Sequence, residues 1–232
     1  MNERQHLILK LIVEEFIGSA EPVGSKSLLE RYGLEVSSAT IRNDMCALER
    51  AGYLLQPYTS AGRIPTEQAY LFYLEHHAEP VCADEDQEKL LQSLGNLESE
   101  EVTIKALAKT VSGLLGQAVF VAFDPGWSYY TGISELFSKP DFRELAHVRD
   151  LSKVIDRFDE VLPLWFEQME NDLDVLIGEM NPLGSDVASV MTRYKTKQGT
   201  IGLFGVVGPI RLDYERTIAL IDQVKGLIEN NI

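Results

Sequence analysis

The chain has 232 residues, of which 45% are hydrophobic and 25% charged, as expected for a soluble globular protein of one large or two small domains. Its two cysteines, Cys46 and Cys82, exclude a disulfide framework and fit a reducing cytoplasm. No apolar run approaches the roughly 18 residues of a membrane span, and the N-terminal stretch "MNERQHLILKLIVEEF" is unlike a signal peptide. We therefore expect a cytoplasmic protein without a membrane partner.

The formal net charge of −15 is unevenly distributed along the chain. Residues 1–73 carry seven Lys or Arg and nine Asp or Glu, whereas residues 74–101 carry one Lys and nine Asp or Glu. Such an acidic protein is a poor nonspecific binder of nucleic acid or of anionic membranes. Any binding to DNA must therefore be specific and come from the nearly neutral N-terminal part. We interpret residues 75–101 as an acidic connector, partly helical around Gln87–Leu94.

Three helices are predicted near the N-terminus. Apolar residues at helical spacing between Ile8 and Phe16 predict the first, and "SKSLLERYG" predicts the second, with Ser25 as its N-cap. "LEVSSATIRNDMCALERAG" predicts the third helix, with Ser37 as its N-cap and Gly52 at its end.

A small hairpin is predicted next, in "YLLQPYTSAGRIPT". We expect short strands around Tyr53–Gln56 and Arg63–Ile64, joined by a tight turn at Thr59–Gly62, because Pro57 and Pro65 limit strand pairing. A fourth helix begins in "TEQAYLFYL". Three helices followed by a hairpin is the order of a winged helix–turn–helix domain, which we assign to residues 1–74.

In such a domain the first two turns of the third helix reach base edges in the major groove. With Ile41, Met45 and Leu48 turned inward, Arg42 and Asn43 face outward. Arg can bind guanine and Asn adenine, while the wing tip reaches the neighbouring backbone or minor groove. The alternatives are a solvated surface or a protein-docking module. The predicted DNA-binding residues are Lys26, Ser38, Thr40, Arg42, Asn43, Tyr58, Ser60 and Arg63.

The rest of the chain, residues 102–232, reads as an α+β domain. "TIKALAKTVSGLLG" predicts a helix, "QAVFVAF" and "DVLIG" predict buried strands, and "DVASVMTRYKTKQGTIGLFGVVGP" predicts a hairpin with its turn near Lys197–Gly199. Helical patterns cover Asp141–Asp156 and Glu160–Asn171, and a last helix follows Asp213 as its N-cap. The pattern gives about four strands.

Several stretches resemble the HrcA family of bacterial heat-inducible transcription repressors. They are "EPVGSK", "SSATIRN" and "TSAGRIPT" in the first domain, then "GISELFSKPDF", "VLIGEMNPLGSD" and "GLFGVVGPIRLDYERTIALIDQV", in the family's order. The resemblance implies a homodimer that binds an inverted-repeat operator of double-stranded DNA upstream of chaperone operons. It also implies relief of repression on heat shock, with the GroEL chaperonin favouring the active repressor, and a GAF-like fold for residues 102–232.

The sequence departs from the family in one respect. Family members are considerably longer and carry a dimerising insert within the GAF-like domain. Here "QAVFVAFDPGWSYYTGISELF" runs almost directly from one matching segment to the next, so the insert has no counterpart and the GAF-like domain is reduced. We therefore predict dimerisation through residues 102–232 themselves, and marginal stability of this domain as the basis of a heat response.

No pattern of catalytic residues is present in the sequence: GxSxG, P-loop and GxGxxG motifs are lacking. A metal site from His76, His77 and Cys82 is disfavoured because adjacent histidines point in different directions, and the aromatic residues Trp127 and Trp165 fit a core or an interface better than a ligand cage. We expect no enzyme activity, cofactor or metal. The open alternatives are a protein-docking or chaperone-linked adaptor whose winged helix no longer binds DNA and, less favoured, a small-ligand sensor or enzyme.

Overall fold

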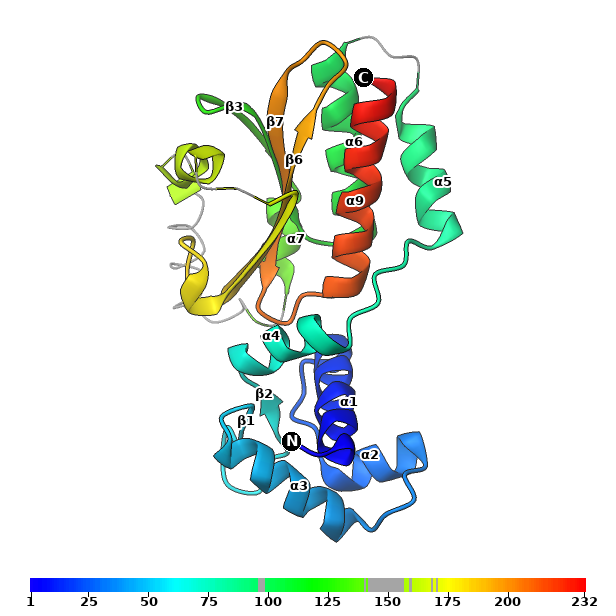
Figure 1. Ribbon diagram of the computed structural model, residues 1–232, viewed down its shortest axis with the longest axis vertical. Helices are drawn as coiled ribbons and strands as arrows, with labels where there is room; N and C mark the ends of the chain where they lie inside the picture. The colour runs from blue at the N-terminus through cyan, green and yellow to red at the C-terminus, as the bar shows by residue number, and fades with distance from the viewer. Residues whose placement is uncertain (96–98, 140, 142–156, 159, 168, 170) are drawn as a thin grey trace. The chain divides into compact units, whose positions relative to one another are not determined.

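The computed structural model describes residues 1–95, 99–139, 141, 157–158, 160–167, 169 and 171–232. The chain divides into two compact units, Met1–Glu79 and Pro80–Ile232 (Figure 1). Helices and antiparallel strands occur in both units, so the predicted mixed α+β class is confirmed. Within these described residues, no helix is long and apolar enough to cross a membrane.

The first unit consists of three helices, a two-stranded hairpin and a fourth helix, in the order that the sequence predicts. The hairpin is antiparallel, with Leu54 opposite Pro65 and Leu55 opposite Ile64. The elements are α1 (Glu3–Ser19), α2 (Ser25–Tyr32), α3 (Ser38–Arg50), β1 (Leu54–Leu55), β2 (Ile64–Pro65) and α4 (Glu67–His76).

Helix starts follow local side-chain chemistry, with one correction to the prediction. The Ser37 hydroxyl accepts a hydrogen bond of 3.1 Å from the amide of Thr40, which confirms Ser37 as the N-cap of α3. The prediction that Ser25 caps α2 is wrong. Gly24 is the N-cap, no side chain caps the helix, and Ser25 is already its first helical residue.

The second unit is a five-stranded antiparallel sheet with helices on its faces. The strand order is β4-β3-β7-β6-β5, so β4 and β5 are the edges. The strands are β3 (Ala118–Asp124), β4 (Trp127–Thr131), β5 (Leu173–Ile177), β6 (Val187–Lys195) and β7 (Ile201–Pro209), and the helices are α5 (Asp84–Ser93), α6 (Glu100–Leu115), α7 (Ile133–Ser138), a short 3₁₀ turn (Gly178–Met180) and α9 (Tyr214–Asn231).

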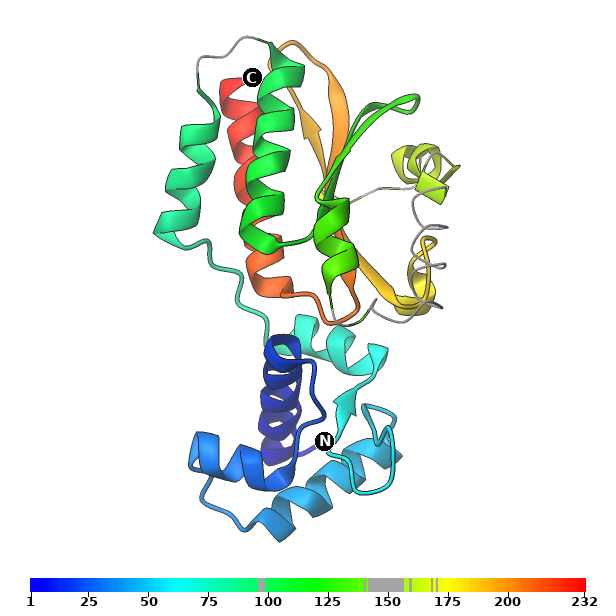
Figure 2. The ribbon, with the colours of Figure 1, turned by 180° about the vertical axis from the view of Figure 1, so that it is seen from behind.

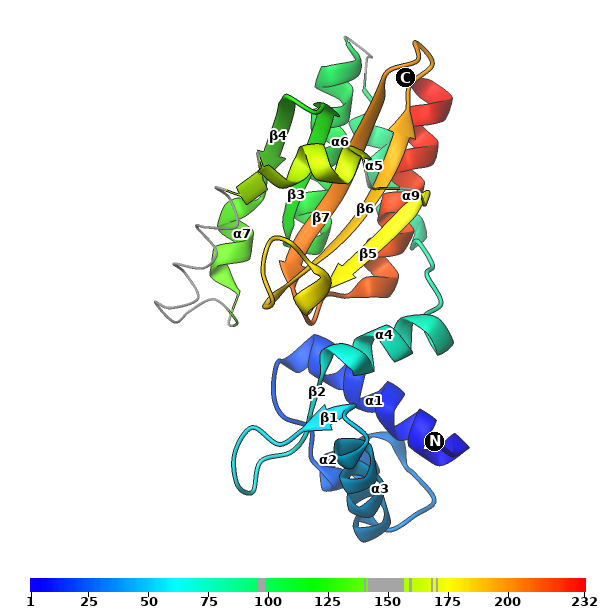
Figure 3. The same cartoon turned by 60° about the vertical axis from the view of Figure 1, so that its left-hand side comes forward.

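Both faces of this sheet are covered. Helices α6 and α9 lie on one face, with α5 outside them (Figures 1 and 2). The opposite face of the sheet is turned toward the viewer in Figure 3. On that face Phe120 of β3 stacks on Trp165 with ring centroids 5.3 Å apart, and Phe158 packs beside both. Strands β3 and β7 therefore bury both alternating sets of side chains, as their nearly continuous apolar sequences require.

Two of the three glycines of "GLFGVVGP" make room for aromatic rings. A Cβ on Gly205 would lie 2.4 Å from the ring of Phe120, and one on Gly202 would lie 2.3 Å from the ring of Tyr194. The predicted reading of this stretch as a packed strand is confirmed. The hairpin turn and the Asp213 N-cap of α9 are also as predicted.

Some elements differ from the prediction. The helix expected in part around Gln87–Leu94 is present as α5, but it is packed and not a solvated connector. Its Leu90 is fully buried, and its Asp86 accepts two hydrogen bonds from Arg216 of α9, at 2.9 and 3.1 Å. Strand β4 is a fifth strand beyond the four expected. Trp127 on it is 52% exposed, whereas Trp165 is core. The helix expected at Asp141–Asp156 lies outside the described residues except for Asp141.

Candidate nucleic-acid interface

Helix α3 has a buried apolar face and an exposed polar face. Ile41, Met45 and Leu48 are buried, as the helical spacing predicts, and Arg42 and Asn43 are exposed. Within the described residues, neither exposed side chain has a hydrogen bond or ion-pair partner. The first two turns of α3 therefore present a free guanidinium and a free carboxamide.

Asp44 holds α3 in place and was not singled out by the sequence. Its side chain is 8% exposed and accepts hydrogen bonds of 2.6 and 3.4 Å from the Arg4 guanidinium of α1. The signal was present in the sequence, because an acidic residue between Ile41 and Met45 falls on the inward face of α3 and needs a partner there.

The start of α3 carries hydroxyl groups that serve the helix itself. Thr40 lies with its hydroxyl 2.9 Å from that of Ser37, and both Ser38 and Thr40 are half-buried. These two predicted contact residues are therefore less accessible than Arg42 and Asn43.

The hairpin tip is open. Tyr58 is 66% exposed, and Ser60 is exposed with a positive φ of 70°. The turn is fixed by a hydrogen bond of 3.0 Å from the Ala61 amide to the Tyr58 carbonyl and another of 3.0 Å from the Gln56 side chain to the Ala61 carbonyl. Tyr58 and Ser60 are thus held on an ordered tip.

The hairpin is anchored to the loop between α1 and α2. Val23 and Arg63 exchange two backbone hydrogen bonds of 2.9 Å. A Cβ on Gly62 would lie 2.4 Å from the Val23 carbonyl oxygen, so the backbones touch at this point. The "EPVGSK" and "TSAGRIPT" stretches, separate in sequence, form one joint.

Arg63 points inward. Its side chain is 12% exposed, and its guanidinium lies 3.0 and 2.9 Å from the Glu49 carboxylate of α3. One of its terminal nitrogens also lies 3.9 Å from Cys46 Sγ. The sequence predicts Arg63 on the wing surface, whereas this geometry makes it a strut between hairpin and helix.

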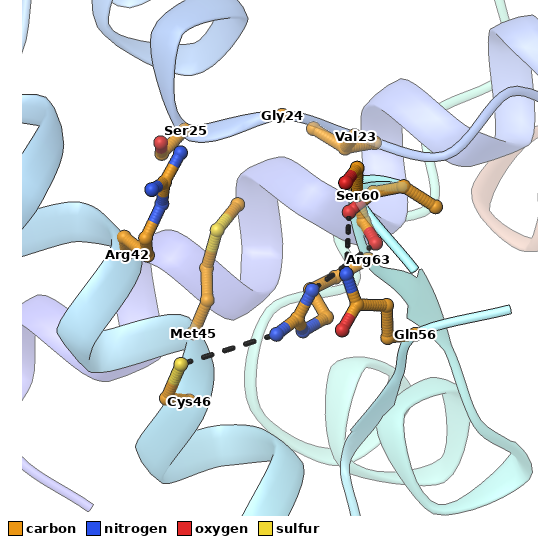
Figure 4. Close-up of a pocket in the computed structure, with 11 residues that line it drawn as sticks. Val23, Gly24, Ser25, Arg42, Met45, Cys46, Gln56, Ser60 and Arg63 are labelled. Atoms are coloured by element: carbon orange, nitrogen blue, oxygen red, sulfur yellow. Dashed lines mark hydrogen bonds between the residues drawn. The ribbon is translucent and has the colours of Figure 1, made fainter. Parts of the chain in front are cut away.

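A hollow of about 340 Å³ lies between α3, the start of α2 and the hairpin; we call it the wing hollow. Figure 4 shows Arg42 reaching toward Ser25 on one side and Arg63 with Gln56 on the other. Lys26, the remaining predicted residue, is exposed on α2 next to Ser25. The lining residues are Val23, Gly24, Ser25, Arg42, Met45, Cys46, Gln56, Ser60, Ala61, Gly62 and Arg63.

The hollow thus brings together three predicted residues, Arg42, Ser60 and Arg63, and Ser25 beside Lys26. They come from all three motifs of the N-terminal resemblance. Its described lining contains two arginines and no acidic residue. Among the residues that the structure describes, no group of three His, Cys, Asp or Glu side chains could hold a metal ion. The arrangement suits an anionic, extended ligand.

Comparison with known proteins identifies relatives of this chain. Residues 69–218 match the family model described as the HrcA protein C-terminal domain. The heat-inducible transcription repressor HrcA of Bifidobacterium longum strain DJO10A is 46% identical over 120 residues, 51% of this chain and 32% of that protein. The protein of the same description from Synechococcus elongatus is 42% identical over 132 residues, 56% of this chain and 37% of that protein.

The matched portions span about a third of the length of these curated relatives. A solved structure described only as a hypothetical protein covers 99% of this chain and 98% of its own, with a TM-score of 0.83 at 19% identity, and so shares the fold. Because the family model covers well over half of the residues, the chain belongs to the HrcA family.

Proposed function

We propose that the chain is a transcriptional repressor that binds an inverted-repeat operator as a homodimer and controls heat-shock chaperone genes. The observation that carries the proposal is the exposed, unpaired Arg42 and Asn43 pair on the first two turns of α3, beside an ordered hairpin tip. A helix end of this kind can enter the major groove while the hairpin contacts the flanking backbone.

The first unit acts in this proposal as a winged helix–turn–helix domain. Asn43 reads a base edge, and Ser38 and Thr40 at the helix start contact the phosphodiester backbone. Tyr58 and Ser60 on the tip, together with Lys26 of α2, extend the contact along the DNA. Arg63 contributes by holding the hairpin against α3.

The second unit acts as the GAF-like regulatory and dimerisation domain. Two copies of a module with a net charge near −2 gain affinity by binding two half-sites together. The relatives' description as heat-inducible repressors supports regulation by temperature. In our proposal the GroEL chaperonin maintains the binding-competent dimer.

A mobility-shift assay tests the DNA-binding proposal. The probe is a duplex that the wild-type chain itself selects from random-sequence DNA. Asn43→Ala should weaken binding by about 1–3 kcal/mol and relax selectivity at one base pair of each half-site. Gln92→Ala, which truncates an exposed uncharged side chain of the second unit, is the control.

Failure of the wild-type chain to enrich any sequence would contradict the proposal and favour the adaptor alternative. The chaperonin part is tested separately, by adding GroEL and ATP to heat-treated chain before the shift. We expect more operator-bound chain with GroEL than without it, and an unchanged bound fraction would remove GroEL from the proposal.

A further inference from the structure

One end of the wing hollow carries hydrogen-bond donors without acceptors. Helix α2 starts at Ser25 behind Gly24, which has no side chain to cap it. The first amide groups of a helix have no acceptor within the helix and carry the positive end of its dipole. These amides border the hollow at Gly24 and Ser25.

The Ser25 side chain adds a second donor at the same place. Ser25 is only 7% exposed, yet no hydrogen bond joins its hydroxyl to any residue that the structure describes. Ser25 lines the hollow. An acceptor from outside the chain can therefore reach its hydroxyl there.

Arg42 completes the arrangement from the opposite side. Its side chain extends across the hollow toward Ser25, with no bond drawn between them (Figure 4). The other arginine of the lining, Arg63, is already neutralised by Glu49. Arg42 is therefore the cation of the described lining that remains available to an incoming anion, and no acidic side chain of the lining opposes it.

We propose that this end of the wing hollow binds one phosphate group of the DNA backbone, held by the Arg42 guanidinium, the Ser25 hydroxyl and the first amides of α2. A phosphate suits this set because its oxygens accept a bidentate arginine and further donors at once. The proposal rests on the proposed function and refines it. Arg42 fixes the register of α3 on the duplex, and base reading is left to Asn43.

The test replaces single phosphates of the selected duplex by uncharged methylphosphonates, one position at a time. For the wild-type chain we expect about a tenfold loss of affinity at one position in each half-site. Arg42→Ala should weaken binding to unmodified DNA of every sequence by a similar factor and lower the salt slope by about one unit per half-site. The methylphosphonate at that position should cause no further loss of affinity in this variant.

A matched pair of variants tests the α2 side of the site. Ser25→Asp puts a carboxylate where the phosphate would bind, whereas Ser27→Asp adds the same charge on the exposed side of the same helix. Both carboxylates lie in the first turn, where the helix dipole favours them, and circular dichroism checks that both variants fold. Ser25→Asp should bind all duplexes at least tenfold more weakly than Ser27→Asp.

Several results would overturn the phosphate site while leaving DNA binding intact. One is a loss for Arg42→Ala confined to one base pair, with the methylphosphonate effect retained. Another is equal binding by the two aspartate variants. Stabilisation by inorganic phosphate that Arg42→Ala abolishes, together with a flat methylphosphonate scan, would mark a free-anion site instead. Absence of any selected duplex would overturn this proposal and the proposed function together.

Discussion

Gly62 lies where two backbone segments touch, so it is the residue at which a single methyl group should matter most. A Cβ there would lie 2.4 Å from the Val23 carbonyl oxygen and 2.7 Å from the Pro22 carbonyl carbon, and neither can move without disturbing the hairpin joint. Gly62→Ala should therefore destabilise the first unit by about 1–3 kcal/mol in urea unfolding.

Gly18→Ala is the matched control in the same unit, because a Cβ at Gly18 meets no atom within 4 Å. Gly18 is also helical, so this change should be neutral or stabilising by up to about 1 kcal/mol. Equal unfolding midpoints for the two variants would contradict the close approach at the joint.

Single residues show which features of the site can be predicted from the sequence. The apolar spacing correctly predicts that Ile41, Met45 and Leu48 face inward and that Arg42 and Asn43 are exposed. It could not reveal that Arg63 is paired with Glu49, because the pair joins α3 to a hairpin strand 14 positions later. Partners that meet only after folding leave no periodic signal in the sequence.

Among the elements, the hairpin and α3 are coupled by the Arg63–Glu49 pair. If Arg63 acts as a strut, Glu49→Ala should weaken DNA binding about as much as Arg63→Ala does. If Arg63 instead contacts a phosphate directly, Glu49→Ala should strengthen DNA binding, because removing a negative charge from the protein favours its binding to DNA. The double mutant should lose less binding free energy than the sum of the two single losses, by up to about 1 kcal/mol.

Mobility shifts at several salt concentrations measure this coupling. The salt slope should stay unchanged for both single variants, since no phosphate contact is removed. Tighter binding by Glu49→Ala would return Arg63 to the DNA-contacting surface predicted from the sequence.

Helices α1 and α4 meet at a group of histidines. The ring of His6 lies 6.1 Å from that of His76 and 5.9 Å from that of His77, centroid to centroid. Burial of His77, with Lys10, His6 and His76 nearby, lowers the pKa of His77 below its usual 6.5. The unfolded chain therefore binds this proton before the folded chain does, so acidification from about pH 7 to 5 should lower the free energy of unfolding.

Urea unfolding of wild type and His77→Gln across this range measures the contribution. The variant should lose less stability on acidification, because it has no imidazole to protonate at this position. His76→Gln is the control and should keep most of the wild-type slope, since burial is the largest cause of the lowered pKa of His77. Parallel curves for wild type and His77→Gln would contradict this origin of the pH dependence.

Elements of the second unit were predictable where they are long and strongly patterned. The β6–β7 hairpin and α9 follow directly from their sequences. Strand β4 was missed because "WSYYT" is short, is only half-buried and lies at the sheet edge, where a strand needs no apolar alternation. Helix α5 was expected only in part, around Gln87–Leu94, and not as a packed element, because its acidic residues outnumber its one buried apolar residue, Leu90.

At the scale of the whole molecule, the acidic charge bears on the proposed pairing of two copies on DNA. A net charge of −15 offers little general attraction to DNA, so one recognition module should bind its half-site weakly. A preformed dimer makes the second contact intramolecular and raises affinity by about 10² to 10⁴. We therefore expect a full inverted repeat to bind at least about 100-fold more tightly than an isolated half-site.

The distance between the half-sites and the oligomeric state of the free chain test this expectation. Inserting five base pairs between half-sites rotates them to opposite faces of the duplex and should remove most of this gain, whereas inserting about ten should restore part of it. Light scattering of the free chain at micromolar concentration should give the mass of a dimer. A monomer with equal affinity for half-site and inverted repeat would mean that residues 102–232 do not pair two copies, and that one module binds alone.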